Sequence, residues 1–245
     1  MLGELYQPKG LARETAQAVL EVDEPYAVNV AWGCRNQCDY CYIQYIKKGD
    51  MRLPSKPVVD LVLKQLQEGL RPKGVFVSFN TEPLLLENYA NTWALIRLLR
   101  GWDIRVAVLS KEGVLPVTDW EIRHGVTLVS LSSDFAKMYE PKAVNPLKRL
   151  DALKLASEDG AYTWVSIEPY PPPEVFKQDL RTFLEHLDFV DFMIFGKWNY
   201  DSRCNTVDAK EFYKLAAVEF VDFCKAHGIR YHVKSDTLGG ENVKR

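Results

Sequence analysis

Short apolar stretches alternate with amphipathic segments along most of this chain. The stretches are rich in β-branched and aromatic residues, as strands are, and the segments between them show helical spacing. Apolar residues run continuously through each stretch, which is typical of a parallel sheet buried on both faces. The predicted strands cover residues 26–32, 75–79, 104–109, 126–131, 162–167, 189–195 and, more briefly, 229–233.

Helix start and stop signals flank several of the intervening segments. Proline suits the first turn of a helix, and Thr118 with Glu121 has the spacing of a capping box. An Asn-Pro pair also predicts a helix start, and a glycine some residues later predicts its end. The predicted helices begin after Pro57, near Thr118, after Asn145 over residues 147–157 with Gly160 as the stop, and over residues 208–225.

Six successive strand–helix units predict an α/β fold with a curved parallel sheet, outer helices and right-handed crossovers. A length of 245 residues fits one domain, since α/β barrels commonly reach this size. We expect a short N-terminal extension (1–25), a barrel core (26–235) and a C-terminal tail (236–245). In such folds the loops after the carboxyl ends of the strands form the functional site.

The composition is that of an ordinary globular protein, with 47% hydrophobic and 26% charged residues. A formal net charge of −2 argues against a broad electrostatic grip on nucleic acid, although a local basic groove stays open. No apolar run approaches the roughly 18 residues of a transmembrane helix. The first residues also lack the apolar stretch of a secretory signal. We therefore expect a cytoplasmic protein with no membrane partner.

Three of the five cysteines, Cys34, Cys38 and Cys41, form a CxxxCxxC motif directly after the first predicted strand. Clustered thiolates in a cytosolic chain indicate metal ligation rather than disulfides. Three protein ligands would leave one iron of a [4Fe–4S] cluster open to a cofactor or substrate. The alternative is a zinc site in which His124 or His232 completes a Cys3His set.

This loop resembles the signature of the radical S-adenosylmethionine (SAM) superfamily, in which an aromatic residue, here Tyr40, precedes the last cysteine. The resemblance implies a partial (β/α)6 radical SAM barrel that holds a [4Fe–4S] cluster on the three cysteines and SAM on the open iron. In that superfamily the reduced cluster cleaves SAM to a 5′-deoxyadenosyl radical, which abstracts hydrogen from a substrate. The cofactors carry this chemistry, and the protein orients them.

Polar residues follow the second to fifth predicted strands, where the resemblance implies contacts with SAM. Glu82 would face the SAM amino group, although the same carboxylate would also suit the start of a helix at Pro83. Lys111 would act as a point charge for the SAM carboxylate. The serine hydroxyls are weaker candidates, because hydroxyls at strand ends often act as caps. The expected cofactor-binding residues are Tyr40, Ser78, Asn80, Thr81, Glu82, Lys111, Ser130, Ser132, Ser166 and Glu168.

Further stretches are similar to the spore photoproduct lyase-like group of the superfamily. One departure is Phe79, which stands where the lyase itself has a hydrogen-returning cysteine, so DNA repair is not carried over. The chain is also short, and near neutral, for holding a duplex. The similar stretches are Pro8-Lys9-Gly10, Ala12-Arg13-Glu14, Ser110-Lys111, and Ser130 followed by Glu140-Pro141 and Arg149-Leu150.

Cys204, in the loop after the sixth predicted strand, is the candidate replacement hydrogen donor, and Tyr200 is the candidate hydrogen relay. The alternative for Cys204 is a loop cysteine without a role. Cys224 recurs at helical spacing with apolar residues, which predicts a core position. Candidates for lining a substrate cavity are Lys197, Asn199, Lys234, His232 and Asp236.

The sequence therefore predicts a radical SAM enzyme that abstracts hydrogen from an unidentified substrate: a nucleic acid, a peptide or a small metabolite. An electron donor such as ferredoxin or flavodoxin is the implied partner. The alternatives are a non-catalytic zinc- or cluster-binding nucleic-acid adaptor on the same scaffold and a lyase-like enzyme of DNA photoproduct repair.

Overall fold

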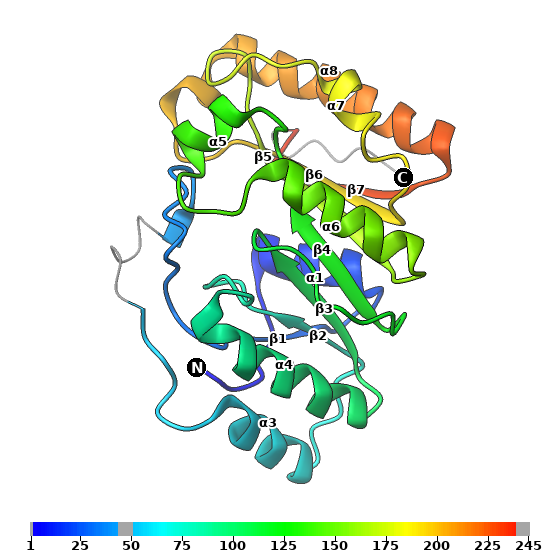
Figure 1. Ribbon diagram of the computed structural model, residues 1–245. Coiled ribbons are helices and arrows are strands. Elements are labelled where there is room, and N and C mark those ends of the chain that lie inside the picture. Colours follow the sequence, from blue (N-terminus) through cyan, green and yellow to red (C-terminus); the bar gives the residue numbers. More distant parts are fainter. Residues whose placement is uncertain (1, 44–50, 239–245) are drawn as a thin grey trace.

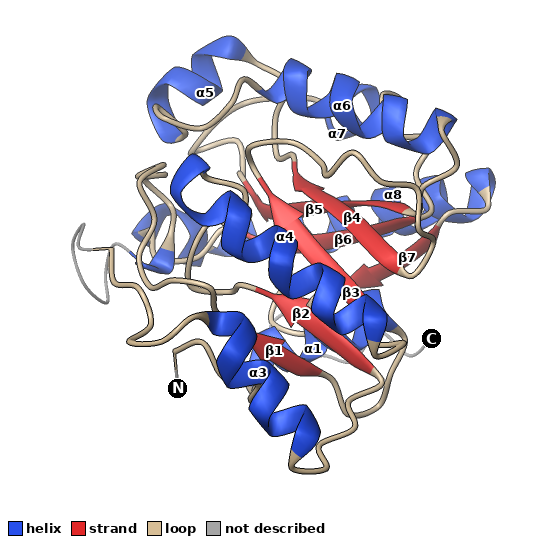
Figure 2. Ribbon diagram, turned by 60° about the horizontal axis from the view of Figure 1, so that its bottom comes forward, coloured by secondary structure: helices blue, strands red, loops and turns tan. Residues whose placement is uncertain are grey.

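The chain forms one curved sheet of seven parallel strands in the order β1 to β7, and Figure 2 shows this sheet from one edge strand to the other. The structure is a computed structural model that describes residues 2–43 and 51–238. Each strand pairs with the next along the chain, so right-handed crossovers place the connecting helices on one face of the sheet. The strands are β1 (Tyr26–Val28), β2 (Gly74–Val77), β3 (Arg105–Ser110), β4 (Ile122–Thr127), β5 (Thr163–Tyr170), β6 (Phe192–Lys197) and β7 (Arg230–Val233).

Most helices cover the outer face of this sheet (Figures 1 and 2). In β2, Val75 and Val77 belong to one hydrophobic cluster with α3 and α4, while Phe76 between them faces the other way. This alternation follows from the two-residue period of a strand. The outer helices are α3 (Val58–Gln67), α4 (Leu86–Gly101), α5 (Ser133–Tyr139), α6 (Pro146–Glu158), α7 (Leu180–Leu184) and α8 (Val207–His227), with a short 3-10 turn η1 (Ser202–Asn205).

Helix α1 (Gly10–Leu20) packs instead against the inner face. Its residues Ala16 and Leu20 share a cluster with Phe76 and Trp164, so the helix fills the concave side near the amino ends of the strands. The sequence analysis left this segment as an extension without a helix. Three of its six apolar residues are alanine, and their partners lie on distant strands.

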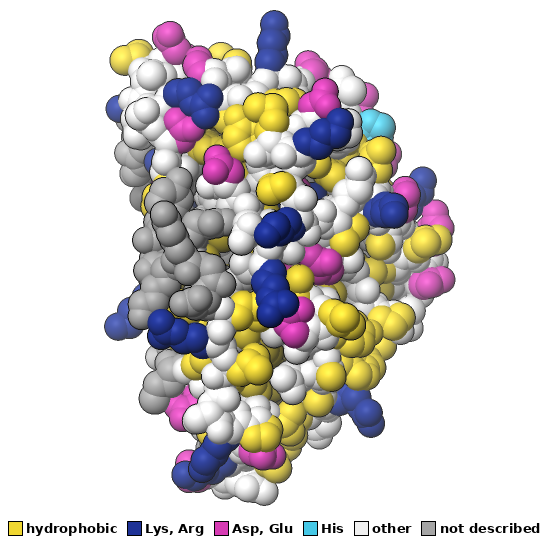
Figure 3. Space-filling model, turned by 60° about the vertical axis from the view of Figure 1, so that its left-hand side comes forward, with side chains coloured by type: hydrophobic (Ala, Val, Ile, Leu, Met, Phe, Trp, Pro, Cys, Tyr) yellow, Lys and Arg dark blue, Asp and Glu magenta, His cyan; other side chains and the backbone are white. Residues whose placement is uncertain are grey.

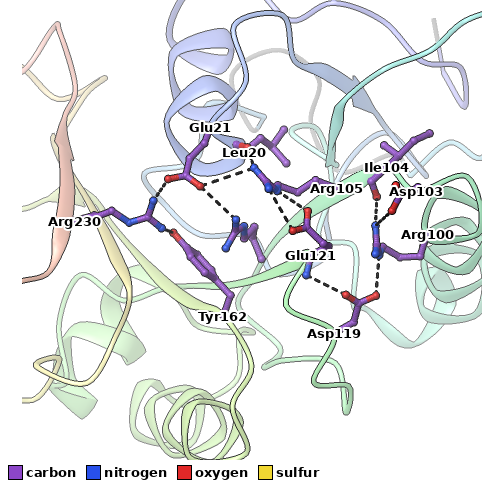
Figure 4. Close-up of polar contacts among 11 residues, drawn as sticks. Leu20, Glu21, Arg100, Asp103, Ile104, Arg105, Asp119, Glu121, Tyr162 and Arg230 are labelled. Atoms are coloured by element: carbon purple, nitrogen blue, oxygen red, sulfur yellow. Dashed lines mark hydrogen bonds and ion pairs between the residues drawn. The ribbon is translucent and has the colours of Figure 1, made fainter.

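Polar contacts tie α1 to both halves of the sheet. Glu21 follows the helix and contacts Arg105 of β3 and Arg230 of β7, as Figure 4 shows. It also lies 3.3 Å from Arg123 of β4. Glu14, near the middle of the helix, accepts a bond from Ser235 just beyond β7. Helix α1 therefore links the edge strand β7 to strands β3 and β4 across the concave side.

Several predicted boundaries are wrong. Strand β4 begins at Ile122 and not at 126, because polar residues within it are buried by specific partners: Arg123 stacks 3.7 Å from the Tyr162 ring. Gly125 is needed because a Cβ there would lie 2.2 Å from Trp164. The capping-box spacing at Thr118 does not start a helix, and β3 and β4 are joined by a connection without one.

The helices predicted from Pro57, Asn145 and residue 208 are confirmed as α3, α6 and α8. Asn145 caps α6 by accepting a bond from the Leu147 N–H, and Gly228 ends α8 with a positive φ of 68°. Among the described residues, no helix is long and apolar enough to span a bilayer.

Candidate functional site

The cysteine loop leaves β1 at the carboxyl end of the sheet and is fixed at several points. Gly33 donates a backbone bond to Asn80 O at 3.0 Å, and its φ of 88° suits only glycine. Further along, the Asp39 N–H donates to Tyr139 O at 2.9 Å and the Cys41 N–H donates to Cys38 O at 3.0 Å. The loop therefore joins β2 on one side and α5 on the other.

A cavity of ≈ 800 Å³ opens beside this loop. It lies where the sequence analysis expected the site, at the carboxyl ends of the strands, and is closed on another side by residues before and within α1. All but three of the predicted site residues line it: Cys34, Cys38, Cys41, Tyr40, Ser78, Asn80, Thr81, Glu82, Lys111, Ser166, Glu168 and Tyr200.

The three thiols of the loop share this cavity wall. Burial raises the pKa of Cys34 to about 11 and that of Cys38 to about 12, so the metal-free thiols of these two residues are protonated at neutral pH. Among residues 2–43 and 51–238, no three His, Cys, Asp or Glu side chains are grouped as a ready-made metal site. Cluster assembly would thus have to deprotonate the thiols and draw them together.

Glu82 and Lys111 form the charged part of the wall nearest the loop. Glu82 is 6% exposed and accepts bonds from the backbone N–H groups of Leu84 and Lys111 at 3.1 and 2.8 Å. Burial raises the pKa of Glu82, against the hydrogen bonds from Lys111 and Ser110. Helix α4 starts at Leu86, so Glu82 does not begin a helix at Pro83. Its carboxylate ties the ends of β2 and β3 together.

The Lys111 side chain points across the cavity wall toward the loop. Its Nζ lies 5.4 Å from the centre of the Tyr40 ring. Burial lowers the pKa of Lys111, but the charges of Cys38 and Glu140 outweigh it and raise the pKa overall. Lys111 therefore places a positive charge beside the cysteine loop.

Asn29, which the sequence analysis missed, shapes the turn that follows β2. Its Oδ1 accepts bonds from the Phe79 and Asn80 N–H groups, both at 3.0 Å, and its Nδ2 donates to the Tyr6 hydroxyl. These bonds end β1 at Val28, short of the predicted residue 32. The feature of the sequence that could have indicated this role is a single asparagine within an otherwise apolar run.

The far wall of the cavity holds a buried cation and a carboxylate. Lys234 is 2% exposed and donates to Leu11 O and Thr15 Oγ1 at 2.7 and 2.6 Å, while Glu168 Oε2 lies 3.8 Å from its Nζ. Gly196 makes room for them, because a Cβ there would lie 2.8 Å from Glu168 Cγ. Burial raises the pKa of Glu168, against the opposing effect of Lys234.

Three predicted site residues do not line the cavity. Ser132 caps α5 by accepting bonds from the Asp134 and Phe135 N–H groups, and Ser130 Oγ accepts from the Ser132 N–H. The alternative role, as caps, is therefore what their contacts show. Cys204 is 6% exposed within the core that η1 and α8 share, and burial raises its pKa to about 11. The candidate hydrogen donor thus lies away from the cavity.

The other candidates are divided. Asn199 lines the cavity and donates to Asp236 at 3.3 Å, whereas Lys197 does not line it. Cys224 is fully buried in the α8 core, as predicted. His232 pairs with Glu14 at 2.6 Å, and His124 is enclosed within β4. Neither histidine lines the cavity, so the Cys3His alternative lacks its fourth ligand there.

His124 makes stability sensitive to acid. Burial lowers its pKa to about 4 from an ordinary 6.5, so the unfolded chain takes up this proton at a higher pH than the folded one does. The stabilisation that neutral His124 provides is complete above pH 6.5. As the pH falls to 4, the free energy of unfolding decreases by about 3 kcal/mol.

Urea unfolding of the His124→Gln variant at pH 7 and pH 4 tests this directly. The parent should lose about 3 kcal/mol more than the variant between these two pH values. Substitution of the exposed His186 by glutamine is the matched control and should leave the parent's pH dependence in place. Equal pH dependence in the parent and the His124 variant would contradict the assignment.

Comparison with known proteins places this geometry in a known fold. No family profile matches the sequence. The chain is 24% identical over 188 residues to the uncharacterized protein ORF301 of Acidianus two-tailed virus, covering 67% of this chain and 62% of ORF301. Streptococcus suis SuiB bound to S-adenosylmethionine superposes with a TM-score of 0.66 at 12% identity, covering 89% of this chain and 52% of SuiB.

Spore photoproduct lyase complexed with dinucleoside spore photoproduct gives a TM-score of 0.63 at 16% identity, covering 85% of this chain and 76% of the lyase. The chain thus spans less than two thirds of ORF301 and about half of SuiB. At these identities the likeness establishes the fold. It is that of radical SAM structures, with a sheet that does not close, and the predicted partial barrel is confirmed.

Proposed function

Because the chain has the radical SAM fold, we propose that it is a radical SAM enzyme that abstracts hydrogen from a substrate held in the 800 Å³ cavity. One observation carries the proposal. The three cysteines of a CxxxCxxC loop line the same cavity as Glu82, Lys111 and Glu168, at the carboxyl ends of the strands. An exposed zinc loop would have no need of buried charges around it.

The residues of the loop suit a cluster by their chemistry. Cys34, Cys38 and Cys41 would provide three thiolates, the ligands that iron–sulfur clusters take, and no histidine among the described residues lines the cavity with them. Lys111 would offset the negative charge of the deprotonated thiols. When bound, the cluster and SAM would together supply a 5′-deoxyadenosyl radical for hydrogen abstraction.

The remaining residues would bind and orient the cofactor and the substrate. We assign the SAM amino-acid portion to Asn80, Thr81, Glu82 and Lys111, because the carboxylate of Glu82 and the ammonium of Lys111 are complementary to an ammonium and a carboxylate. The Ser166 hydroxyl, on a residue 4% exposed, would serve the ribose. Tyr200 and the Glu168–Lys234 pair on the far wall would contact the substrate. Tyr200 is also the proposed hydrogen relay, in place of the enclosed Cys204.

The substrate class stays a proposal with three members: nucleic acid, peptide or small metabolite. The similar structures include a SuiB bound to its precursor peptide SuiA and the lyase with its dinucleoside, so the fold serves both kinds. Figure 3 shows lysine, arginine, aspartate and glutamate side chains interspersed on one described face, without a stripe of one sign. A ferredoxin or flavodoxin would deliver the electron.

Anaerobic reconstitution with iron and sulfide tests the proposal. The protein should turn brown, hold close to four irons per chain and release 5′-deoxyadenosine from SAM when dithionite is added. The same protein without reconstitution is the control and should release none. A colourless protein that retains one zinc, or a cluster-loaded protein that leaves SAM intact, would overturn the proposal.

A further inference from the structure

A buried ion pair stands behind the cysteine loop. Glu140 ends α5 and Arg149 lies in α6, and both side chains are 1% exposed. The Arg149 Nη2 donates to Glu140 Oε2, and its Nη1 donates to Thr127 O at the end of β4 at 2.6 Å. The pair therefore sits at a junction of β4, α5 and α6, close to the carboxyl end of the sheet.

The other carboxylate oxygen of Glu140 reaches the cysteine loop. It accepts the hydroxyl hydrogen of Tyr40, which stands between Asp39 and Cys41 in the chain. The Tyr40 ring packs edge-on against Trp198, with centroids 5.0 Å apart, and faces Lys111 on another side. The hydrogen bond to Glu140, the packing on Trp198 and the contact with Lys111 together hold the Tyr40 side chain in one position.

The pair is costly if its only role is to stabilise the fold. Taking two charges out of water costs several kcal/mol per ion, and well-packed apolar residues often serve stability as well or better. Within the described residues, Arg149 Nε also has no hydrogen-bond partner. In some proteins, buried charges of this kind are retained because they specify one arrangement of the groups around them.

We infer that Glu140 and Arg149 are positioning residues for the cysteine loop: through Tyr40 they hold Cys38 and Cys41 in place for cluster assembly. The inference rests on the proposed function in one respect, that this loop binds the cluster. The wall formed by β4, α5 and α6 thereby sets the geometry of ligands that come from the loop after β1. Neither residue touches the reacting groups.

Thiol alkylation of the metal-free protein tests the inference without any cofactor. Iodoacetamide labelling, followed cysteine by cysteine with mass spectrometry, reports how often the loop opens. The Tyr40→Phe variant keeps the ring and loses the bond to Glu140. We expect Cys38 to be labelled on the order of 10-fold faster in it, because the lost bond is to a buried charge. Labelling of Cys224 should not change.

The Tyr139→Phe variant is the matched control. Tyr139 is a second buried tyrosine that packs on Trp198, but its hydroxyl donates to Val175 O and not to Glu140. Its loss should leave Cys38 labelling within a factor of about two of the parent, since the bond to Glu140 stays. Equal rates in the parent and Tyr40→Phe proteins would overturn the inference, as would equal acceleration in both tyrosine variants.

A double variant, Glu140→Leu with Arg149→Met, removes both charges together and avoids an unpaired buried one. We expect it to fold, by circular dichroism, and to label Cys38 as fast as Tyr40→Phe does. After reconstitution, both should hold less iron and give an altered electron paramagnetic resonance signal. If the parent itself binds no cluster, the proposed function fails, yet the labelling rates still decide whether the pair positions the loop. If the double variant does not fold, Tyr40→Phe decides alone.

Discussion

Substitution of Cys38 by serine is expected to weaken cluster binding by more than about 100-fold and to reduce 5′-deoxyadenosine formation to background, since changes to residues that only contact a metal's ligands already cost about 10- to 100-fold. Cys38 is the middle one of the three proposed ligands and is 5% exposed, so no solvent-borne ligand can replace its thiolate easily. A serine hydroxyl stays protonated where a thiol is already hard to ionise. Iron and sulfide content per chain, with chromatography of the nucleoside product, measures both effects.

Cys204→Ser is the matched control, because it makes the same chemical change at a cysteine outside the cavity. It should reconstitute like the parent and cleave SAM at the parent's rate. A Cys38→Ser protein with parental iron content would show that the ligand set is wrong. A Cys204→Ser protein that keeps its cluster but fails to complete turnover on a substrate would return Cys204 to its predicted role as hydrogen donor.

Much of this site could be predicted because its parts follow strands whose apolar runs are unmistakable. Parallel strands bring their carboxyl ends to one edge, so residues as distant as Cys34, Lys111 and Glu168 were expected together and do line one cavity. The predicted strand boundaries were wrong where polar residues lie within the sheet. In β4, Arg123 is stacked on Tyr162 and His124 is enclosed. The pattern of polar and apolar residues along one strand cannot show that neighbouring strands provide such partners.

The supporting contacts were beyond the sequence for a related reason. Helix α1 has its counterparts on β2, β3 and β7, so its pattern alone does not reveal a buried position. Glu140 and Arg149 stood out by resemblance to known sequences, but their link to Tyr40 spans 100 residues and depends on how β4 places α5. Ser130 and Ser132 failed as cavity residues because β4 ends at Thr127, earlier than predicted, and the chain then turns into α5.

Lys111→Met is expected to weaken SAM binding to the reconstituted protein by about 10- to 100-fold, because a hydrogen bond to a charged group contributes about 1.5–3 kcal/mol. Methionine matches the lysine stem in length and removes only the charge. The backbone N–H of residue 111 still holds Glu82, so the loop should keep its shape. What disappears is the cation that lies 5.4 Å from the Tyr40 ring, beside the thiolates and within reach of a carboxylate in the cavity.

Equilibrium dialysis of SAM against reconstituted protein measures this loss, and iron content shows whether the cluster is retained. Lys142→Met is the matched control, because Lys142 is exposed on the loop after α5 and does not line the cavity. Weaker SAM binding with full iron content would place Lys111 at the cofactor's carboxylate. Weaker SAM binding together with a loss of iron would show that the Lys111 charge chiefly stabilises the thiolates. Unchanged affinity and unchanged iron would remove Lys111 from the site and leave Asn80, Thr81 and Glu82 to orient the amino-acid portion.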